Sequence, residues 1–153
     1  MATDCRNHGD TMHCMTCNAY GEAIGEGIRG MIMADETVTA RKETPGWPKS
    51  YCSVIFQRGQ FSWTRHPTIC TTRAGWRNAS AAAAKAIGRS NGKLYYHANY
   101  VRPSWSYNCT GREKVGRHIF YSDCHSGGRR QYAHRRHTHW YNARSDDDEG
   151  ASR

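Results

Sequence analysis

Apolar residues near the amino terminus recur at the spacing of an α-helix. The pattern predicts a first helix that Asp10 or Thr11 can cap and that ends at Gly21. Its apolar positions are Met12, Met15, Ala19 and Tyr20. A second pattern of the same kind predicts a helix over residues 27–42, which the proline-containing loop after it stops. A glycine-rich corner, residues 18–27 (NAYGEAIGEG), therefore joins two predicted helices.

The middle of the chain contains one further clear helix between short apolar pieces. The alanine-rich segment 76–88 (WRNASAAAAKAIG) predicts a helix that ends at its glycine. Before it, residues 51–57 (YCSVIFQ) form a short apolar piece, and residues 60–64 (QFSWT) predict a strand. After it, segments 93–105 and 114–122 carry aromatic and histidine side chains and are predicted to be extended.

Length and composition favour one domain with a distinct tail. A chain of 153 residues has room for one ordinary domain with a real core, which we place at residues 1–126. Residues 127–153 are rich first in arginine, histidine and glycine and then in acidic residues, without apolar periodicity, so we expect a flexible tail. No apolar run reaches the length of a membrane span, and the first ten residues lack the apolar core of a secretory signal.

The chain is strongly basic. Its formal net charge is +9, and arginine is much more frequent than lysine. This charge favours an anionic partner such as nucleic acid, anionic lipid or the acidic polymers of a bacterial envelope. A nucleic-acid-binding module is disfavoured, because the arginines are scattered through the chain and no recognisable nucleic-acid motif accompanies them.

The chain has seven cysteines, an odd number. With no export signal, a full disulfide framework is not expected, and at least one thiol of a monomer must stay free. Cys14 and Cys17, preceded by His13, could form half of a zinc site. The distant completions would be Cys109, Cys124 and His125. Because these lack paired spacing, we expect buried thiols and no metal site.

Two glutamates, Glu22 and Glu26, lie in the glycine-rich corner. Glu22 follows an apolar helix end and stands between glycine and alanine, which makes it the acidic residue best placed for partial burial. Desolvation raises the pKa of a carboxyl group and preserves the proton that a general acid needs. The alternative is that both glutamates cap the second helix and interact with the positive end of its dipole. The residue types alone leave both interpretations open.

Aromatic residues recur in the second half of the chain beside polar residues. They are Phe61, Trp63, Trp76, Tyr95, Tyr96, Tyr100, Trp105, Phe120 and Tyr121. Flat rings next to hydrogen-bonding groups suit a sugar-binding groove, because a pyranose has apolar faces and polar edges. Core packing is the alternative and should hold for about half of these rings. Trp63 and Trp105, each next to a serine, are the better groove candidates.

The order of segments resembles the germination-type cell-wall hydrolase family, the SleB- and CwlJ-like peptidoglycan hydrolases of bacteria and phages. The matching pieces are NAYGEAIGEG, GMIMADETVTAR, YCSVIFQ, GQFSWT, WRNASAAAAKAIG, YYHANYVRPSW and VGRHIFY, in the order of the family. They run from about Cys14 to Tyr121. The chain departs from the family pattern at Ile24, where arginine is usual, and at Ala40, where asparagine commonly precedes Arg41. The resemblance says nothing about the tail.

The resemblance implies a lysozyme-like, mainly helical α+β fold with a small β element. It further implies cleavage of peptidoglycan glycan strands between N-acetylmuramic acid and N-acetylglucosamine, as in lytic transglycosylases. Glu22 is then the general acid and later the base, and Glu26 orients it or caps a helix. Predicted sugar-binding side chains are Gln60, Ser62, Trp63, Tyr96, His97, Trp105 and His118. The alternatives are a muramidase that uses Glu22 with Glu26, and a non-catalytic wall-binding protein.

The sequence also gives expectations about location and partners. We expect a monomer without a cofactor, made without a signal peptide in the cytoplasm of a host bacterium, as a phage endolysin is. It would reach the cell wall after release or by a separate delivery route. The basic tail could then bind anionic envelope polymers by charge attraction.

Overall fold

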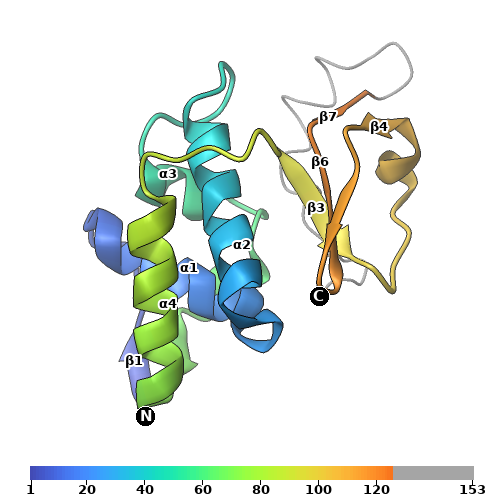
Figure 1. The fold of residues 1–153 in the computed structure, drawn as a ribbon. Helices are drawn as coiled ribbons and strands as arrows, with labels where there is room; N and C mark the ends of the chain where they lie inside the picture. The colour runs from blue at the N-terminus through green and yellow to red at the C-terminus, as the bar shows by residue number, and fades with distance from the viewer. Residues whose placement is uncertain (126–153) are drawn as a thin grey trace.

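Helices make up one side of the described structure, and the strands of a small sheet lie on the other (Figure 1). The computed structural model describes residues 1–125, so the predicted tail lies outside the described residues. The α-helices are α1 (Thr11–Ala23), α2 (Gly27–Lys42), α3 (Tyr51–Ile55) and α4 (Arg73–Ala86). Single turns of 3-10 helix are η1 (Ile24–Glu26), η2 (Ser62–Arg65) and η3 (Ser104–Asn108).

Helices α1, α2 and α4 pack directly against one another. The packed face of α4 is made of small side chains, because Ala79, Ala82, Ala83 and Ala86 are all fully buried. Gly75 at the start of α4 continues this face, and a Cβ atom there would lie 2.8 Å from the ring of Tyr20. The alanine-rich segment therefore allows three helices to approach closely.

The strands form three small antiparallel sheets. The main sheet has the order β3 (Tyr95–Ala98), β6 (His118–Tyr121) and β5 (Glu113–Val115). The pairs are β1 (Ala2–Asp4) with β2 (Thr68–Cys70), and β4 (Cys109–Thr110) with β7 (Asp123–Cys124). In the main sheet Tyr96 lies opposite Phe120, and His97 lies opposite Ile119. Successive residues of a strand point to opposite faces, so Tyr96 faces the helices and His97 faces outward.

The predicted mainly helical α+β class is confirmed. The predicted bounds of α2 are also confirmed. Asp10 caps α1 as predicted, because its side chain accepts a hydrogen bond from the backbone of His13. The predicted end of the first helix at Gly21 is wrong, since α1 continues to Ala23. A Cβ atom on Gly21 would lie 2.7 Å from the Trp63 ring, so this glycine permits close packing and does not end the helix.

The structure also defines the short elements in the middle of the chain. Residues 51–55 are helix α3, which Ser50 caps by accepting a hydrogen bond from the backbone of Ser53. The strand predicted at 60–64 is wrong, since residues 62–65 form η2. Burial of Trp63 against the helices outweighs the strand preference of the aromatic residues there.

The expectation of buried thiols is also wrong. The disulfides are Cys5–Cys17, Cys14–Cys52 and Cys109–Cys124. Cys70 is the free and exposed cysteine, in agreement with the odd count. Two of the bridges fasten α1, one to the chain after β1 and the other to α3. Spacing along the chain does not show which cysteines meet, because each bridge joins residues from different elements.

A separate finding concerns membranes. Across residues 1–125, every helix is too short or too polar to cross a bilayer.

Candidate active site

The Glu22 carboxyl group lies at the end of α1 and meets the main sheet. Glu22 is half-buried in the last turn of the helix, and Tyr96 is buried on the sheet face that packs against the helices. The Tyr96 hydroxyl donates a hydrogen bond of 2.5 Å to Glu22 Oε1. Burial, together with the negative charge of Glu22, raises the pKa of Tyr96 well above its usual range. The phenol therefore stays protonated and remains a donor to this carboxyl group.

A buried polar network supports α1 one turn before Glu22. Trp63 Nε1 donates a hydrogen bond to Asn18 Oδ1 over 3.1 Å, and Asn18 Nδ2 donates to Asp35 Oδ1 over 3.2 Å. Asn18 and Asp35 are both fully buried. Asn18 is four residues before Glu22, so the two side chains lie on the same face of α1.

Asp35 is a buried acid close to Glu22. Burial raises the pKa of Asp35 well above its usual value, and the charge of Glu22 adds to the rise, while the hydrogen bond from Asn18 opposes it. Within residues 1–125 its second oxygen, Oδ2, has no hydrogen-bond partner. Burial and the charge of Glu22 thus both favour the neutral form of the Asp35 carboxyl group.

Glu26 is held by the turn between β5 and β6. Its Oε1 accepts a hydrogen bond of 2.7 Å from the Arg117 backbone, and its Oε2 accepts one of 2.9 Å from Arg117 Nε. Gly116 lies beside this contact with φ of +60°, and a Cβ atom there would lie 2.5 Å from Glu26 Oε1. Glu26 occupies the N-cap position of α2, but its side chain makes no capping hydrogen bond to the helix.

The charge state of Glu26 follows from these contacts. Burial by itself raises the pKa of Glu26, but the hydrogen bonds from Arg117 and the nearby charges of His118 and Arg117 outweigh it, so that the net direction is downward. Glu26 is therefore an ionised carboxylate with both oxygens bonded to Arg117.

A sequence profile of the cell wall hydrolase family matches residues 25–121, well over half of the chain. The chain belongs to this family. The matched range includes Glu26 and Asp35 and begins shortly after Glu22. No curated protein sequence matches this cell wall hydrolase.

Two solved structures share the fold of the hydrolase. The catalytic domain of the Bacillus cereus SleB protein has a TM-score of 0.62 and 23% identity, over 76% of this chain and 94% of that one. The catalytic domain of the germination-specific lytic transglycosylase SleB from Bacillus anthracis has a TM-score of 0.62 and 22% identity, over 75% and 98% of the two chains.

His118 belongs to the same face of the sheet as Tyr96. The ring centroids of the two side chains are 5.4 Å apart. Burial lowers the pKa of His118, and the charge of Arg117 acts in the same direction, while Glu26 opposes both. The structure thus brings together four of the predicted site residues in this hydrolase: Glu22, Glu26, Tyr96 and His118.

Three other predicted residues lie around η2. Gln60 is fully buried, and its Oε1 accepts a hydrogen bond of 3.3 Å from Arg41 Nη1. Trp63 is only 9% exposed and supports Asn18, so it belongs to the packed scaffold in this structure. Ser62 is partly exposed at the start of η2. Their roles in substrate binding stay predictions.

His97 and Trp105 lie on the opposite face of the main sheet from Glu22. His97 Nε2 is 2.9 Å from the Tyr121 hydroxyl, and the His97 and Trp105 rings meet edge to face at 5.7 Å. The sheet therefore separates these two predicted residues from Tyr96 and Glu22.

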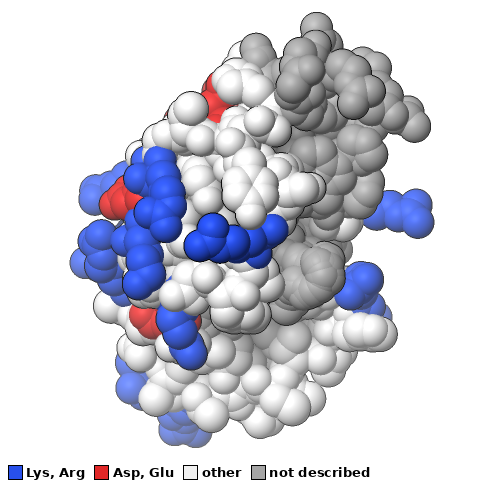
Figure 2. Space-filling model, turned by 90° about the vertical axis from the view of Figure 1, so that its right-hand side faces the viewer, with Lys and Arg blue, Asp and Glu red and all other residues white. Residues whose placement is uncertain are grey.

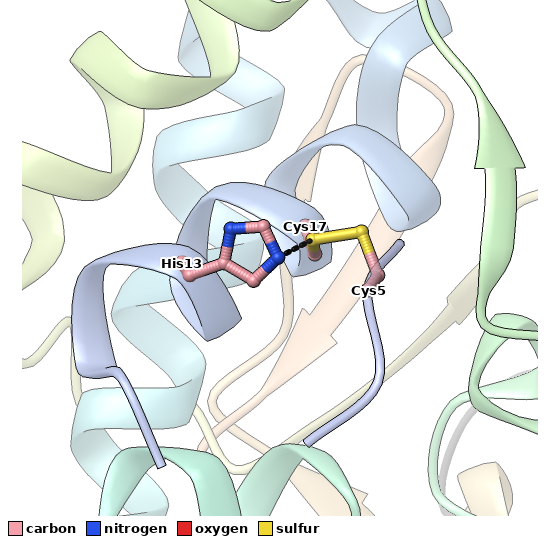
Figure 3. A group of neighbouring side chains, drawn as sticks. All are labelled: Cys5, His13 and Cys17. Carbon is pink, nitrogen blue, oxygen red and sulfur yellow. Dashed lines mark hydrogen bonds between the residues drawn. A yellow bond between two sulfur atoms is a disulfide. The ribbon is translucent and has the colours of Figure 1, made fainter. Parts of the chain in front are cut away.

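One group in residues 1–125 has the residue types of a metal site (Figure 3). Its members are Cys5, His13 and Cys17, whose candidate ligand atoms lie within 4.8 Å of one another. The two sulfurs are joined as a disulfide, and His13 Nε2 lies 3.7 Å from Cys17 Sγ. Metal binding by cysteine requires the thiolate form. In the oxidised hydrolase only the imidazole of this group is available as a ligand.

Sequence analysis missed Asn18 and Asp35. A signal for Asp35 was present, because it lies among Met31, Ala34 and Val38, on the apolar face of the predicted second helix. An acid on that face is buried when the helix packs. Asn18 lies one helical turn before Glu22, but an asparagine at that spacing is too common to stand out.

Proposed function

We propose that this cell wall hydrolase cleaves the glycan strand of peptidoglycan between N-acetylmuramic acid and N-acetylglucosamine, with Glu22 as its acid and base. The observation that carries the proposal is the setting of the Glu22 carboxyl group. It is partly exposed, bonded to Tyr96 and backed by the buried network of Asn18, Asp35 and Trp63. The Bacillus anthracis protein with a similar fold is a lytic transglycosylase by description.

The proposed reaction uses one carboxyl group twice. Protonated Glu22 gives its proton to the glycosidic oxygen as the bond to C1 of the muramic residue breaks. The resulting carboxylate takes the proton of the muramic 6-hydroxyl, and that oxygen closes on C1 to form a 1,6-anhydro ring. Tyr96 favours the first step, because a donor to the carboxylate stabilises the charged form that Glu22 takes when it gives up its proton.

The surroundings of Glu22 favour this route over a two-carboxylate hydrolysis. A hydrolase needs a second carboxyl group about 5 to 10 Å away that is free to act on water or on the sugar. Both oxygens of Glu26 are bonded to Arg117, and Asp35 is fully buried. With an internal hydroxyl as nucleophile, the reaction needs no activated water.

Mass analysis of the fragments released from purified peptidoglycan tests the proposal. We expect muropeptides that end in 1,6-anhydro-muramic acid, about 18 Da lighter than the hydrolytic products, because intramolecular attack excludes water. Glu22→Gln protein, incubated in parallel, should release them about 10²- to 10⁴-fold more slowly. Reducing-end products would contradict the transglycosylase route and give Glu26 the role of catalytic partner. Binding without any released fragment would favour a non-catalytic wall-binding protein.

Delivery to the wall and the part played by the tail are further proposals. The tail, residues 127–153, would bind anionic envelope polymers by charge attraction, and the enzyme would reach the wall by release or by a separate route. The arginine- and histidine-rich composition of the tail supports its binding to anionic polymers. A truncated chain, residues 1–126, should then bind whole envelopes more weakly at low salt, and the difference should shrink as salt rises.

A further inference from the structure

A cavity of about 470 Å³ opens on the outer face of the main sheet, away from Glu22. His97, Ile119 and Tyr121 line it from β3 and β6, on the face opposite to Tyr96. The loop after β3 and the turn η3 form its other walls. We call this cavity the outer pocket. The proposed glycan cleavage uses none of the side chains that line it.

Positive charge gathers in the outer pocket. Arg102, Arg112 and Lys114 line it and are exposed, and among residues 1–125 no aspartate or glutamate lines it. Within residues 1–125, none of these three cations forms an ion pair. The nearby Glu113 pairs with Lys93 and Arg29 instead. Lys and Arg cover much more of this side of the molecule than Asp and Glu do (Figure 2).

The arginine charges act on the buried side chains of the outer pocket. Burial lowers the pKa of His97, and the charges of Arg112 and Arg102 lower it further. Burial raises the pKa of Tyr121, against hydrogen bonds from Ser106 and Arg112. A neutral imidazole, a protonated phenol and two guanidinium groups thus converge on one space. Like charges held together without a counter-ion cost free energy, which a bound anion would recover.

We propose that the outer pocket binds a phosphate group. Guanidinium groups match the oxygens of phosphate in a bidentate way, and the lysine adds a further donor and charge. A single carboxylate would offer two oxygens and one negative charge against three cations, whereas inorganic phosphate offers more of both and a phosphodiester polymer brings several such charged groups side by side. The phosphate can be free inorganic phosphate or a phosphodiester of an envelope polymer.

Calorimetric titration of the full chain with inorganic phosphate, in phosphate-free buffer at constant ionic strength, tests this site. The pocket variant combines Arg102→Gln, Arg112→Gln and Lys114→Gln. The control variant combines Arg73→Gln, Arg77→Gln and Lys85→Gln, which remove equal charge from exposed positions of α4. Wild type and control should bind phosphate with a saturable isotherm, and the pocket variant should bind about tenfold or more weakly.

Several outcomes of this titration would overturn the proposal. These are non-saturable binding by wild type, an equal loss of affinity in the control variant, or binding of acetate as tight as that of phosphate. Thermal unfolding of both variants without phosphate establishes that they are folded. A parallel titration with poly(glycerol phosphate) distinguishes the source, because tighter binding than free phosphate identifies an envelope polymer and equal binding identifies the free ion.

An NMR pH titration of His97 gives a second measurement. Bound phosphate would offset the charges of Arg102 and Arg112, so the pKa of His97 should rise when phosphate is added. The rise should be absent in the pocket variant. A His97 titration that phosphate leaves unchanged in wild type would contradict binding at this site. Neither measurement depends on Glu22 or on peptidoglycan cleavage.

Discussion

The Tyr96 hydroxyl donates a 2.5 Å hydrogen bond to the Glu22 carboxyl group across 74 residues of sequence. This bond joins the main sheet to the end of α1 and so links the strand side of the fold to its helical side (Figure 1). It fixes the direction of a carboxyl group that is partly exposed and lies beside the sheet. Each element contributes a different property, since α1 supplies the acid and β3 supplies a donor that stays protonated.

Tyr96→Phe removes this hydrogen bond and keeps the ring. A hydrogen bond to a charged group contributes about 1.5 to 3 kcal/mol, so turnover should fall about 10- to 100-fold with little change in KM. Tyr20→Phe is the matched control, because its hydroxyl accepts a hydrogen bond of 3.0 Å from the backbone of Thr72, just before α4. Kinetics on soluble glycan fragments measure both. Equal turnover in the two variants would contradict a catalytic contribution of Tyr96.

Glu22→Gln removes the transferable proton and keeps the size of the side chain. Activity should fall about 10²- to 10⁴-fold, the usual contribution of a general acid or base. Glu26→Gln should cost less than about tenfold, because it weakens a contact to Arg117, a side chain 67% exposed to solvent. Wall-lysis assays compare the variants, and circular dichroism establishes that both are folded. Full activity of folded Glu22→Gln protein would overturn the proposed mechanism.

Asp35→Asn should make stability less dependent on pH. The pKa of Asp35 is higher in the folded state than in the unfolded one. Protonation of Asp35 therefore stabilises the folded state at low pH, and this stabilisation is lost as pH rises above about 3.9. The loss approaches about 1.4 kcal/mol per pH unit between the two pKa values. Urea unfolding should therefore show that the free energy of unfolding of the Asp35→Asn protein, relative to that of wild type, increases between pH 4 and pH 7. A constant difference between the two proteins would mean that Asp35 is ionised in the fold.

Removal of the Cys14–Cys52 bridge should destabilise the fold more than removal of Cys109–Cys124. The first bridge spans 38 residues and the second 15, which predicts losses of about 4 and 3 kcal/mol from the entropy of the unfolded chain. Paired Cys→Ser variants and urea unfolding measure these losses. Cys70→Ser is the control and should stay within about 0.5 kcal/mol of wild type. A thiol assay on the denatured, unreduced chain should detect one thiol; a higher number would contradict the three bridges.

Local sequence patterns predicted helices α1, α2 and α4 and singled out Glu22 as a candidate, whose role stays a prediction. The bounds of α2 follow from apolar spacing and a proline stop, and the alanine-rich face of α4 follows from composition. Gly21 was misleading, because the reason for the glycine is the Trp63 ring, which comes from a distant part of the chain. A local pattern cannot distinguish a glycine that ends a helix from one that makes room for a neighbour.

Contacts between distant segments decide the rest of the candidate site. Tyr96, the partner of Glu22, lies 74 residues further along the chain. Arg117, the partner of Glu26, lies 91 residues further along. Residue types made His97 as good a sugar-binding candidate as Tyr96, and only the pairing of β3 with β6 shows that they point to opposite faces. The disulfides depend in the same way on tertiary proximity.

The alternation of side chains along β3 makes this strand intolerant of insertions and deletions. Adding or removing one residue before Tyr96 would exchange the two faces of the strand, turning the phenol outward and the imidazole toward Glu22. Both the carboxyl group and the outer pocket would then lose a neighbour through a single change in chain length. Substitutions on the outward face carry no such double cost, so a laboratory redesign can alter that surface while the strand keeps its register.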